Sequence, residues 1–271
     1  MKLLFISLGC DKNLVDTEHM LSMITKDGIT ITNDENEADV IVVNSCCFIS
    51  DAMEESIQTL IDMGSLKETA NLKALIVTGC LAERYAKEIA EQIPEDADLV
   101  ILGNPNNPTG QPVSRPVLEQ VLAVCHRIGC MLMMDESFFD FLVPEDQKRT
   151  MDCTKIAGED PSVFVLKSFT KMYAMPGLRF GYAICADVKL LEQMRSGMQP
   201  WNVSLPAQAA ASAAASEVAF AKKTAQQVAQ NRQWMIGKLR EAGVTVYDSV
   251  TNYLLLEGPA DLKERCLEKG Y

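Results

Sequence analysis

The segment from Ser168 to Tyr182 carries side chains whose types and spacing suit covalent chemistry. Lys171 follows a short apolar run (163–166), and Arg179 follows the lysine across a Pro-Gly turn. A lysine at the end of a buried strand is costly unless its amine is neutral, paired or covalently used. A desolvated amine loses its proton more easily and becomes nucleophilic, which favours Schiff-base chemistry at Lys171. Taken alone, Lys171 is better explained as one of two ordinary cations in a surface loop.

Further polar side chains follow other apolar segments of the chain. Asn107 and Asp135 each lie at or just beyond such a segment, as Ser168 and Lys171 do. Because an α/β sheet usually binds its ligand at the carboxyl ends of its strands, we expect these groups to lie together. Each also has a plainer interpretation: Asp135 as a strand-end cap, Asn107 as a turn former and Arg179 as a surface cation.

Together, the five side chains supply what a pyridoxal phosphate site requires. A lysine forms the internal aldimine, and a carboxylate pairs with the pyridinium nitrogen and keeps the ring an electron sink. An amide donates to the phenolate oxygen, while a hydroxyl and a guanidinium hold the phosphate. The presence of all these groups predicts a site for this cofactor, built from Asn107, Asp135, Ser168, Lys171 and Arg179.

Three cysteines suggest a second site in the first hundred residues. Cys10, Cys46 and Cys80 each follow a short, continuously apolar run, as expected for strands buried on both faces. Parallel strands end at one edge of a sheet, so the three thiols are expected to converge there. Three thiolates suit an iron–sulfur cluster or a soft metal, and the alternative is that they pack as small hydrophobic side chains.

Apolar runs alternate with helical patterns along the chain, which predicts a three-layer α/β fold with mostly parallel sheets that begins with a βαβ module. Ser114 and Gly129 bound one helix, Gly243 ends another, and the Asn107–Pro108 bond is a candidate for the cis form. We expect strands over 2–7, 39–45, 73–79, 98–103, 130–134, 163–166, 179–186, 244–247 and 252–257, and helices over 16–26, 51–63, 81–92, 114–128 and 206–242.

The first part of the chain resembles the amino-terminal domain of methylthiotransferases, enzymes that modify a ribosomal protein or tRNA. The segments 7–18, 43–49 and 77–85 carry the resemblance, which covers residues of about 1–97. The resemblance implies that Cys10, Cys46 and Cys80 hold a [4Fe–4S] cluster. The CxxxCxxC motif of the family's radical-SAM domain occurs nowhere in this chain, so we do not expect the chain alone to perform methylthiolation.

The remainder resembles fold-type-I pyridoxal-phosphate enzymes, particularly histidinol-phosphate aminotransferases and threonine-phosphate decarboxylases. The segments 104–110, 135–138, 168–179 and 252–256 carry this resemblance. It implies that Lys171 is the Schiff-base lysine, Asp135 the pyridinium partner and Asn107 the ring-oxygen contact, with Ser168 and Arg179 on the phosphate. It also implies a small amino-acid or amino-phosphate substrate and a homodimer.

Two details of this resemblance concern the branch of the family and the extent of the match. Phe138 stands where the aminotransferases usually have tyrosine, and together with the segments 173–177 and 199–203 it favours the decarboxylase branch. The amino-terminal third and the carboxy-terminal end of such enzymes are not recognisable in this chain.

The resemblance changes near residue 98, where the charge balance also changes. Residues 1–100 hold 7 Lys+Arg and 19 Asp+Glu, which accounts for the whole net charge of −12. Residues 101–271 hold equal numbers of basic and acidic residues and have no net charge. We divide the chain into a methylthiotransferase-like domain (1–97), a partial large domain (98–228) and the start of a small domain (229–271). Two separate bodies are expected, and one seven-stranded sheet is the alternative. A recombined or truncated chain with neither function is a further hypothesis.

Composition excludes several classes of partner and predicts the compartment. The acidic balance and the lack of clustered Lys and Arg count against nucleic acid as a partner. No apolar run approaches membrane-spanning length, and the first ten residues do not make an export signal. The nine cysteines are an odd, scattered set, which favours reduced thiols and a cytoplasmic protein.

Overall fold

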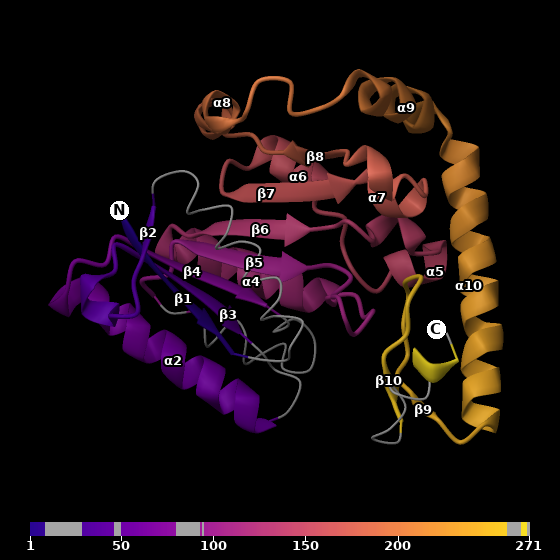
Figure 1. The fold of residues 1–271 in the computed structure, drawn as a ribbon, viewed down its shortest axis with the longest axis horizontal. Coiled ribbons are helices and arrows are strands. Elements are labelled where there is room, and N and C mark those ends of the chain that lie inside the picture. The colour runs from indigo at the N-terminus through magenta and orange to yellow at the C-terminus, as the bar shows by residue number, and fades with distance from the viewer. Residues whose placement is uncertain (9–28, 46–49, 80–92, 94, 259–266, 270–271) are drawn as a thin grey trace.

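The computed structural model describes residues 1–8, 29–45, 50–79, 93, 95–258 and 267–269. Their main feature is a sheet of eight strands in the order β2-β1-β3-β4-β5-β6-β7-β8 (Figure 1). All neighbouring strands are parallel except β7 and β8, which confirms the predicted α/β fold with a mostly parallel sheet. The strands are β1 (Lys2–Ser7), β2 (Thr30–Ile31), β3 (Val40–Ser45), β4 (Ala74–Gly79), β5 (Leu99–Gly103), β6 (Met131–Asp135), β7 (Val163–Ser168) and β8 (Gly181–Ile184).

The strands of both parts of the chain join in this one sheet. β4 pairs with β5 in parallel, with Ile76 opposite Leu99 and Val77 opposite Val100. The expectation of two separate bodies is therefore wrong. The single sheet has one strand more than the seven-stranded sheet considered as the alternative, because it includes the short strand β2. An exposed strand edge leaves backbone groups unpaired, and the pairing of β4 with β5 satisfies them. The division into three domains stays a prediction.

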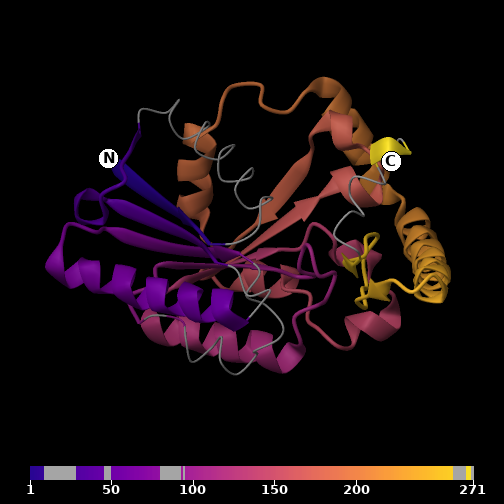
Figure 2. The same ribbon diagram turned by 60° about the horizontal axis from the view of Figure 1, so that its bottom comes forward.

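Helices cover both faces of the sheet. Figure 2 shows α2 (Ser50–Thr69) and α4 (Arg115–Ile128) on one face and α8 (Val188–Gly197) on the other. One core cluster packs α4 on the strands β5 to β7, and another packs α2 on β3 and β4. α4 has the predicted limits, since Ser114 is its N-cap and Gly129 ends it at φ +73. The helix predicted over 51–63 lies within α2, and those over 16–26 and 81–92 lie outside the described residues.

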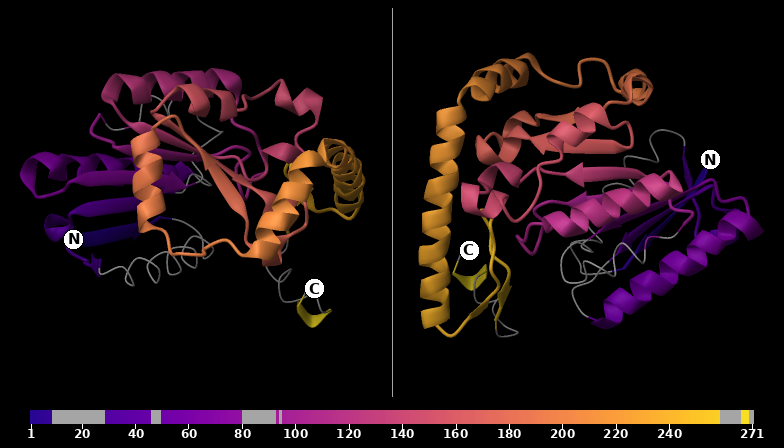
Figure 3. Two further views of the ribbon diagram at one scale, coloured as in Figure 1. Left: turned by 90° about the horizontal axis from the view of Figure 1, so that it is seen from above. Right: turned by 180° about the vertical axis from the view of Figure 1, so that it is seen from behind.

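The alanine-rich segment forms two helices instead of the single one that we predicted. α9 (Leu205–Ser216) and α10 (Val218–Glu241) are separated at Glu217, and Gly243 follows at φ +79 as the expected stop. Figure 3 shows α9 and α10 running in different directions. Helix propensity does not predict this break because it depends on neighbours in sequence. The direction of α10 depends instead on its contacts with η3 (Phe139–Phe141) and β9 (Thr245–Val246).

A carboxy-terminal segment, residues 248–253, lies against the loop that follows β5. Val250 N–H donates to Gly110 O at 2.8 Å, and the Tyr253 hydroxyl donates to Asn106 O at 2.8 Å. Gly110 has φ +70, and a Cβ atom there would clash with the side chain of Ser249, so glycine is the residue that fits. We call residues 248–253 the strap. The strap holds the loop that contains Asn107 and its predicted cis proline bond, which the structure confirms.

The other elements are short. β9 pairs in antiparallel fashion with β10 (Leu256–Glu257), and both are shorter than predicted. None of the described helices is long and apolar enough to cross a membrane. The remaining elements are η2 (Glu35–Glu37), α5 (Pro144–Gln147), α6 (Thr154–Glu159), α7 (Phe169–Met172) and η4 (Pro176–Leu178).

Candidate functional site at the carboxyl edge of the sheet

β5, β6 and β7 are neighbours whose carboxyl ends lie at one edge of the sheet (Figure 1), and the predicted cofactor residues lie at or near these ends in sequence. Asp135, the last residue of β6, stands opposite Gly103 of β5 and Leu166 of β7. Ser168 ends β7 and stands opposite Gly181 at the start of the antiparallel strand β8. Strand register thus places Asp135 and Ser168 on this edge, and the segments with Asn107, Lys171 and Arg179 adjoin it.

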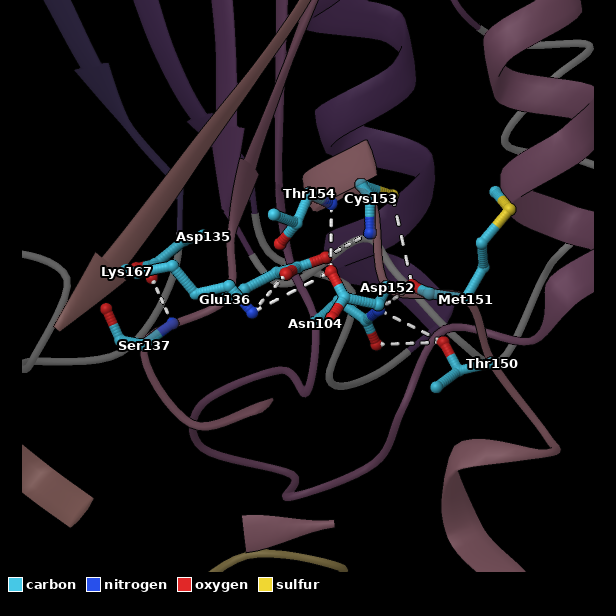
Figure 4. Close-up of polar contacts among 10 residues, drawn as sticks. All are labelled: Asn104, Asp135, Glu136, Ser137, Thr150, Met151, Asp152, Cys153, Thr154 and Lys167. Carbon is cyan, nitrogen blue, oxygen red and sulfur yellow. Dashed lines mark hydrogen bonds and ion pairs between the residues drawn. The ribbon is translucent and has the colours of Figure 1, made fainter. Parts of the chain in front are cut away.

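Asp135 has an exposed carboxylate that is oriented by the chain that follows it. Its Oδ1 accepts a hydrogen bond from Ser137 N–H at 2.9 Å. Figure 4 shows this contact set apart from the larger polar network on Glu136. Because a carboxylate has about four lone-pair positions, Asp135 retains capacity to accept from a ligand.

Ser168 and Arg179 lie on the two sides of the β7–β8 turn. Ser168 Oγ accepts from Thr170 N–H at 3.2 Å and shares a hydrogen bond with Thr170 Oγ1 at 2.7 Å. The exposed Arg179 has φ +53, and its guanidinium donates to Pro176 O at 3.1 Å. Phe169 N–H donates to the carbonyl of Phe180, which holds the two sides of the turn together.

Lys171 is exposed, so the prediction of a desolvated amine is wrong for this residue. Within the described residues no ion pair joins Lys171 to Asp135. The Lys171 Nζ lies 5.5 Å from the ring centroid of Phe138, three residues beyond Asp135. Phe138 in turn meets the Tyr253 ring edge to face at 5.0 Å, and Tyr253 binds the carbonyl beside the exposed Asn107. Phe138 and the strap thus connect the segments that carry Asp135, Lys171 and Asn107.

The buried lysine at this edge is Lys167, which the sequence reasoning missed. Its Nζ lies 2.7 Å from Glu136 Oε2, and the two side chains are 7% and 0% exposed (Figure 4). Glu136 Oε1 accepts from Cys153 N–H at 2.8 Å, and Asp152 lies 3.8 Å from Lys167. Burial raises the pKa of Glu136 to about 7, although Lys167 acts against that rise. Burial alone would lower the pKa of Lys167, but the carboxylates of Glu136 and Asp152 raise it on balance.

Asn104 extends this polar network to β5. Its amide nitrogen donates to Thr150 Oγ1 at 3.0 Å and to Met151 O at 3.2 Å, and its oxygen accepts from Val113 N–H at 3.0 Å. The segment 150–154 therefore connects the carboxyl ends of β5, β6 and β7. Successive strand residues point to opposite faces, so the network lies on one face and the side chains of Asp135 and Ser168 point to the other. In the sequence, Lys167 could have been recognised as a candidate because it is a charged residue directly after the continuously apolar run 163–166.

The predicted cluster cysteines Cys10, Cys46 and Cys80 lie outside the described residues. The strands that precede them in sequence, β1, β3 and β4, are parallel neighbours in that order. Among the described residues, no group of three or more potential metal ligands gathers at one place. The cluster site stays a prediction.

Comparison with protein families divides the chain in two overlapping parts. The family model described as aminotransferase class I and II matches residues 76–269. A second family model, described as uncharacterized protein family UPF0004, matches residues 2–102. The two matches share 76–102, the region in which β4 pairs with β5.

The amino-terminal part is similar to a curated bacterial protein. The ribosomal protein uS12 methylthiotransferase RimO of Lachnoclostridium phytofermentans is 62% identical over 95 residues. That alignment covers 35% of this chain and 22% of the relative, so the chain spans about a fifth of that protein. The predicted resemblance of residues of about 1–97 to methylthiotransferases is confirmed.

Solved structures are similar to the fold of most of the chain. The histidinol-phosphate aminotransferase from Clostridium acetobutylicum superposes with a TM-score of 0.64 at 21% identity, covering 85% of this chain and 66% of that one. L-threonine-O-3-phosphate decarboxylase from Porphyromonas gingivalis gives 0.60 at 21% identity, covering 85% and 64%. The chain covers slightly less than two thirds of each structure. These similarities confirm the α/β fold predicted from the sequence.

Proposed function

We propose, because the chain belongs to the aminotransferase class I and II family, that it binds pyridoxal 5′-phosphate at the carboxyl edge of its sheet. One observation carries the proposal: Asp135 and Ser168 end the neighbouring strands β6 and β7, and Lys171 follows one helical turn later. α/β sheets bind ligands at this edge. Phe138, between Lys171 and the strap, connects this group with the loop of Asn107.

The donor set fits the cofactor in chemistry and in accessibility. Asp135, Lys171, Asn107 and Arg179 are exposed and Ser168 is half-buried, which supports the proposal because none of the five side chains is closed off from a ligand. They supply a carboxylate, an amine, an amide, a guanidinium and a hydroxyl, which match the polar groups of the cofactor. The network of Glu136 and Lys167 behind them fixes the strand ends from the opposite face.

Each residue has a distinct role in this proposal. The cofactor, when bound, supplies an electron-withdrawing ring that stabilises negative charge on a substrate carbon. Asp135 holds a proton on the ring nitrogen, and Asn107 donates to the ring oxygen. Lys171 would condense with the aldehyde carbon with loss of water, and its amine, once displaced by the amine of the substrate, would move a proton at the substrate carbon. Ser168 and Arg179 bind the phosphate by hydrogen bonds and charge.

The proposed substrate is an amino acid or an amino phosphate. The reaction would be decarboxylation, as in threonine-phosphate decarboxylases, or transamination, as in histidinol-phosphate aminotransferases. We favour decarboxylation because Phe138, beside the Lys171 amine, offers no hydroxyl where the aminotransferases usually have tyrosine. A homodimer would supply further pocket residues to each site.

A cofactor titration tests the proposal. We expect pyridoxal 5′-phosphate to produce a saturable absorbance change in the purified chain, and inorganic phosphate to compete with it. Pyridoxal without its phosphate should bind at least about tenfold more weakly, because Ser168 and Arg179 would lose their charged partner. A linear, unsaturable response, or equal binding of the two compounds, would contradict the site.

A second candidate function is the binding of a [4Fe–4S] cluster by Cys10, Cys46 and Cys80. The high identity of this part to a methylthiotransferase supports it, as does the adjacency of β1, β3 and β4. The cysteines follow these three strands in sequence, and three thiolates suit a cluster with one open iron.

Replacement of the three cysteines by alanine tests this candidate. After anaerobic reconstitution we expect oxygen-sensitive iron and sulfide in the unmodified chain, and about background iron in the triple variant. The matched control replaces the buried Cys125, Cys130 and Cys153, which lie in the other part of the chain, and should leave the iron content unchanged. Equal iron in the chain and the variant at Cys10, Cys46 and Cys80 would end this assignment.

A further inference from the structure

A cavity of about 210 Å³ lies away from the proposed cofactor site, between α10, α5 and the strap. Figure 1 shows these elements side by side beyond the carboxyl ends of the strands. None of the five proposed cofactor residues lines the cavity. Its lining includes Asp146 and Arg149 at α5, Arg232, Gln233 and Ile236 on α10, and Asp248 in the strap.

Arg232 is the buried cation of this cavity, with an exposed fraction of only 7%. One guanidinium nitrogen donates to Thr251 O at 2.7 Å, while the buried Nε finds no acceptor among the described residues. Burial lowers the pKa of Arg232, and Asp146 opposes this effect. The Nε atom is too buried to meet a ligand, but only one of the five N–H donors of the guanidinium has a hydrogen bond to the described residues, so an acceptor against its terminal nitrogens would stabilise it.

The other charges of the lining are already paired. Asp146 lies 3.6 Å from Arg149, and Asp248 lies 3.1 Å from Arg240. Among the charged residues of the lining, Arg232 alone has no ion-pair partner within the described residues, and Asp146 acts on it only from a longer distance. Arg232 is therefore the group with which one added negative charge can pair. A dianion such as phosphate would keep one negative charge unpaired, and this charge would be repelled by Asp146 and Asp248. A single carboxylate, by contrast, matches the guanidinium fork in both charge and geometry.

We propose that this cavity binds a small monocarboxylate, held by Arg232 between α10 and the strap. A cavity of 150 Å³ is large enough for benzene, so this one accepts an organic acid of a few heavy atoms. The bound carboxylate contacts groups from α5, α10 and the strap at once. Because it binds only the folded arrangement, it stabilises the packing of α10 on the rest of the chain.

Propionate is the probe that we choose, with propionamide as its uncharged isostere and inorganic phosphate as the dianion. Calorimetric titrations would be run at constant ionic strength. We expect propionate to bind with a Kd on the order of 1 mM, and the other two at least about tenfold more weakly. A thermal melt should show a higher Tm with propionate only. Equal responses to propionate and propionamide, or to propionate and phosphate, would overturn the proposal.

Substitutions on α10 locate the binding. Arg232→Met should abolish propionate binding, and the exposed Gln233→Glu tests the same cavity in a chain whose core is untouched. The new carboxylate should weaken propionate binding by about tenfold through repulsion. Gln226→Glu is the matched control, since this exposed residue lies two turns earlier on α10 and does not line the cavity. Equal affinity in the two glutamate variants would overturn the site.

Discussion

Lys171→Ala is expected to abolish the covalent attachment of pyridoxal 5′-phosphate that borohydride reduction fixes in the unmodified chain. The amine is the only group of the proposed set that can bind the aldehyde covalently, so its removal leaves hydrogen bonds and charge to hold the cofactor. We expect the affinity for the cofactor to fall by about tenfold or more. Peptide mass spectrometry after reduction would locate the modified lysine.

A matched control separates this site from surface labelling. Lys189, on α8, is also exposed and lies in no proposed site, so Lys189→Ala should retain the modified Lys171 peptide. The Lys171→Ala chain should keep its circular dichroism spectrum, because the side chain is exposed and makes no ion pair within the described residues. If the cofactor is fixed at another lysine in the unmodified chain, the role of Lys171 is wrong.

Lys167→Met is expected to be the most destabilising of the substitutions considered, with a loss of about 3–5 kcal/mol in the free energy of unfolding. The substitution leaves the Glu136 carboxylate buried without the cation 2.7 Å away. The double variant Lys167→Met/Glu136→Gln leaves no unpaired buried charge from this pair, and the side-chain oxygen of the introduced glutamine can still accept from Cys153 N–H. We therefore expect its free energy of unfolding to fall by less than that of the single variant. Chemical denaturation would measure these values.

Lys238→Met is the control for this comparison. Lys238 and Glu241 are also 2.7 Å apart, but their side chains are 57% and 67% exposed. Because exposed ion pairs contribute little, this variant should lose less than about 1 kcal/mol. Equal losses from Lys167→Met and Lys238→Met would show that burial does not decide the strength of the Glu136 pair.

The loss in Lys167→Met should also depend on pH in a defined direction. Burial raises the pKa of Glu136 above its usual 4.5, and removal of the lysine removes a cause that lowers it. Between 4.5 and the raised pKa, the folded chain then binds a proton that the unfolded chain does not, so stability rises as pH falls. The difference from the unmodified chain should shrink from pH 8 to pH 5. An increase over this range would contradict the account.

Local features of the fold were predicted closely from the sequence. The strand over 2–7 and the helix ending at Ile128 have the expected limits, because a short apolar run, an N-cap serine and a glycine act within a few residues. The candidate site residues were found in the same way, from polar groups that follow apolar runs. The burial of Lys167 was not, since alternate strand residues face opposite sides and only the packing decides which side is covered.

The sequence by itself determined seven of the eight strands of the large sheet, the residue types at their carboxyl ends and the two family resemblances. Only the tertiary structure decided that β4 pairs with β5, that Glu136 shields Lys167, and that the strap reaches the loop of Asn107. The reason is physical: strand and cap signals depend on neighbours in sequence, whereas strand pairing and buried charge depend on groups brought together across the fold.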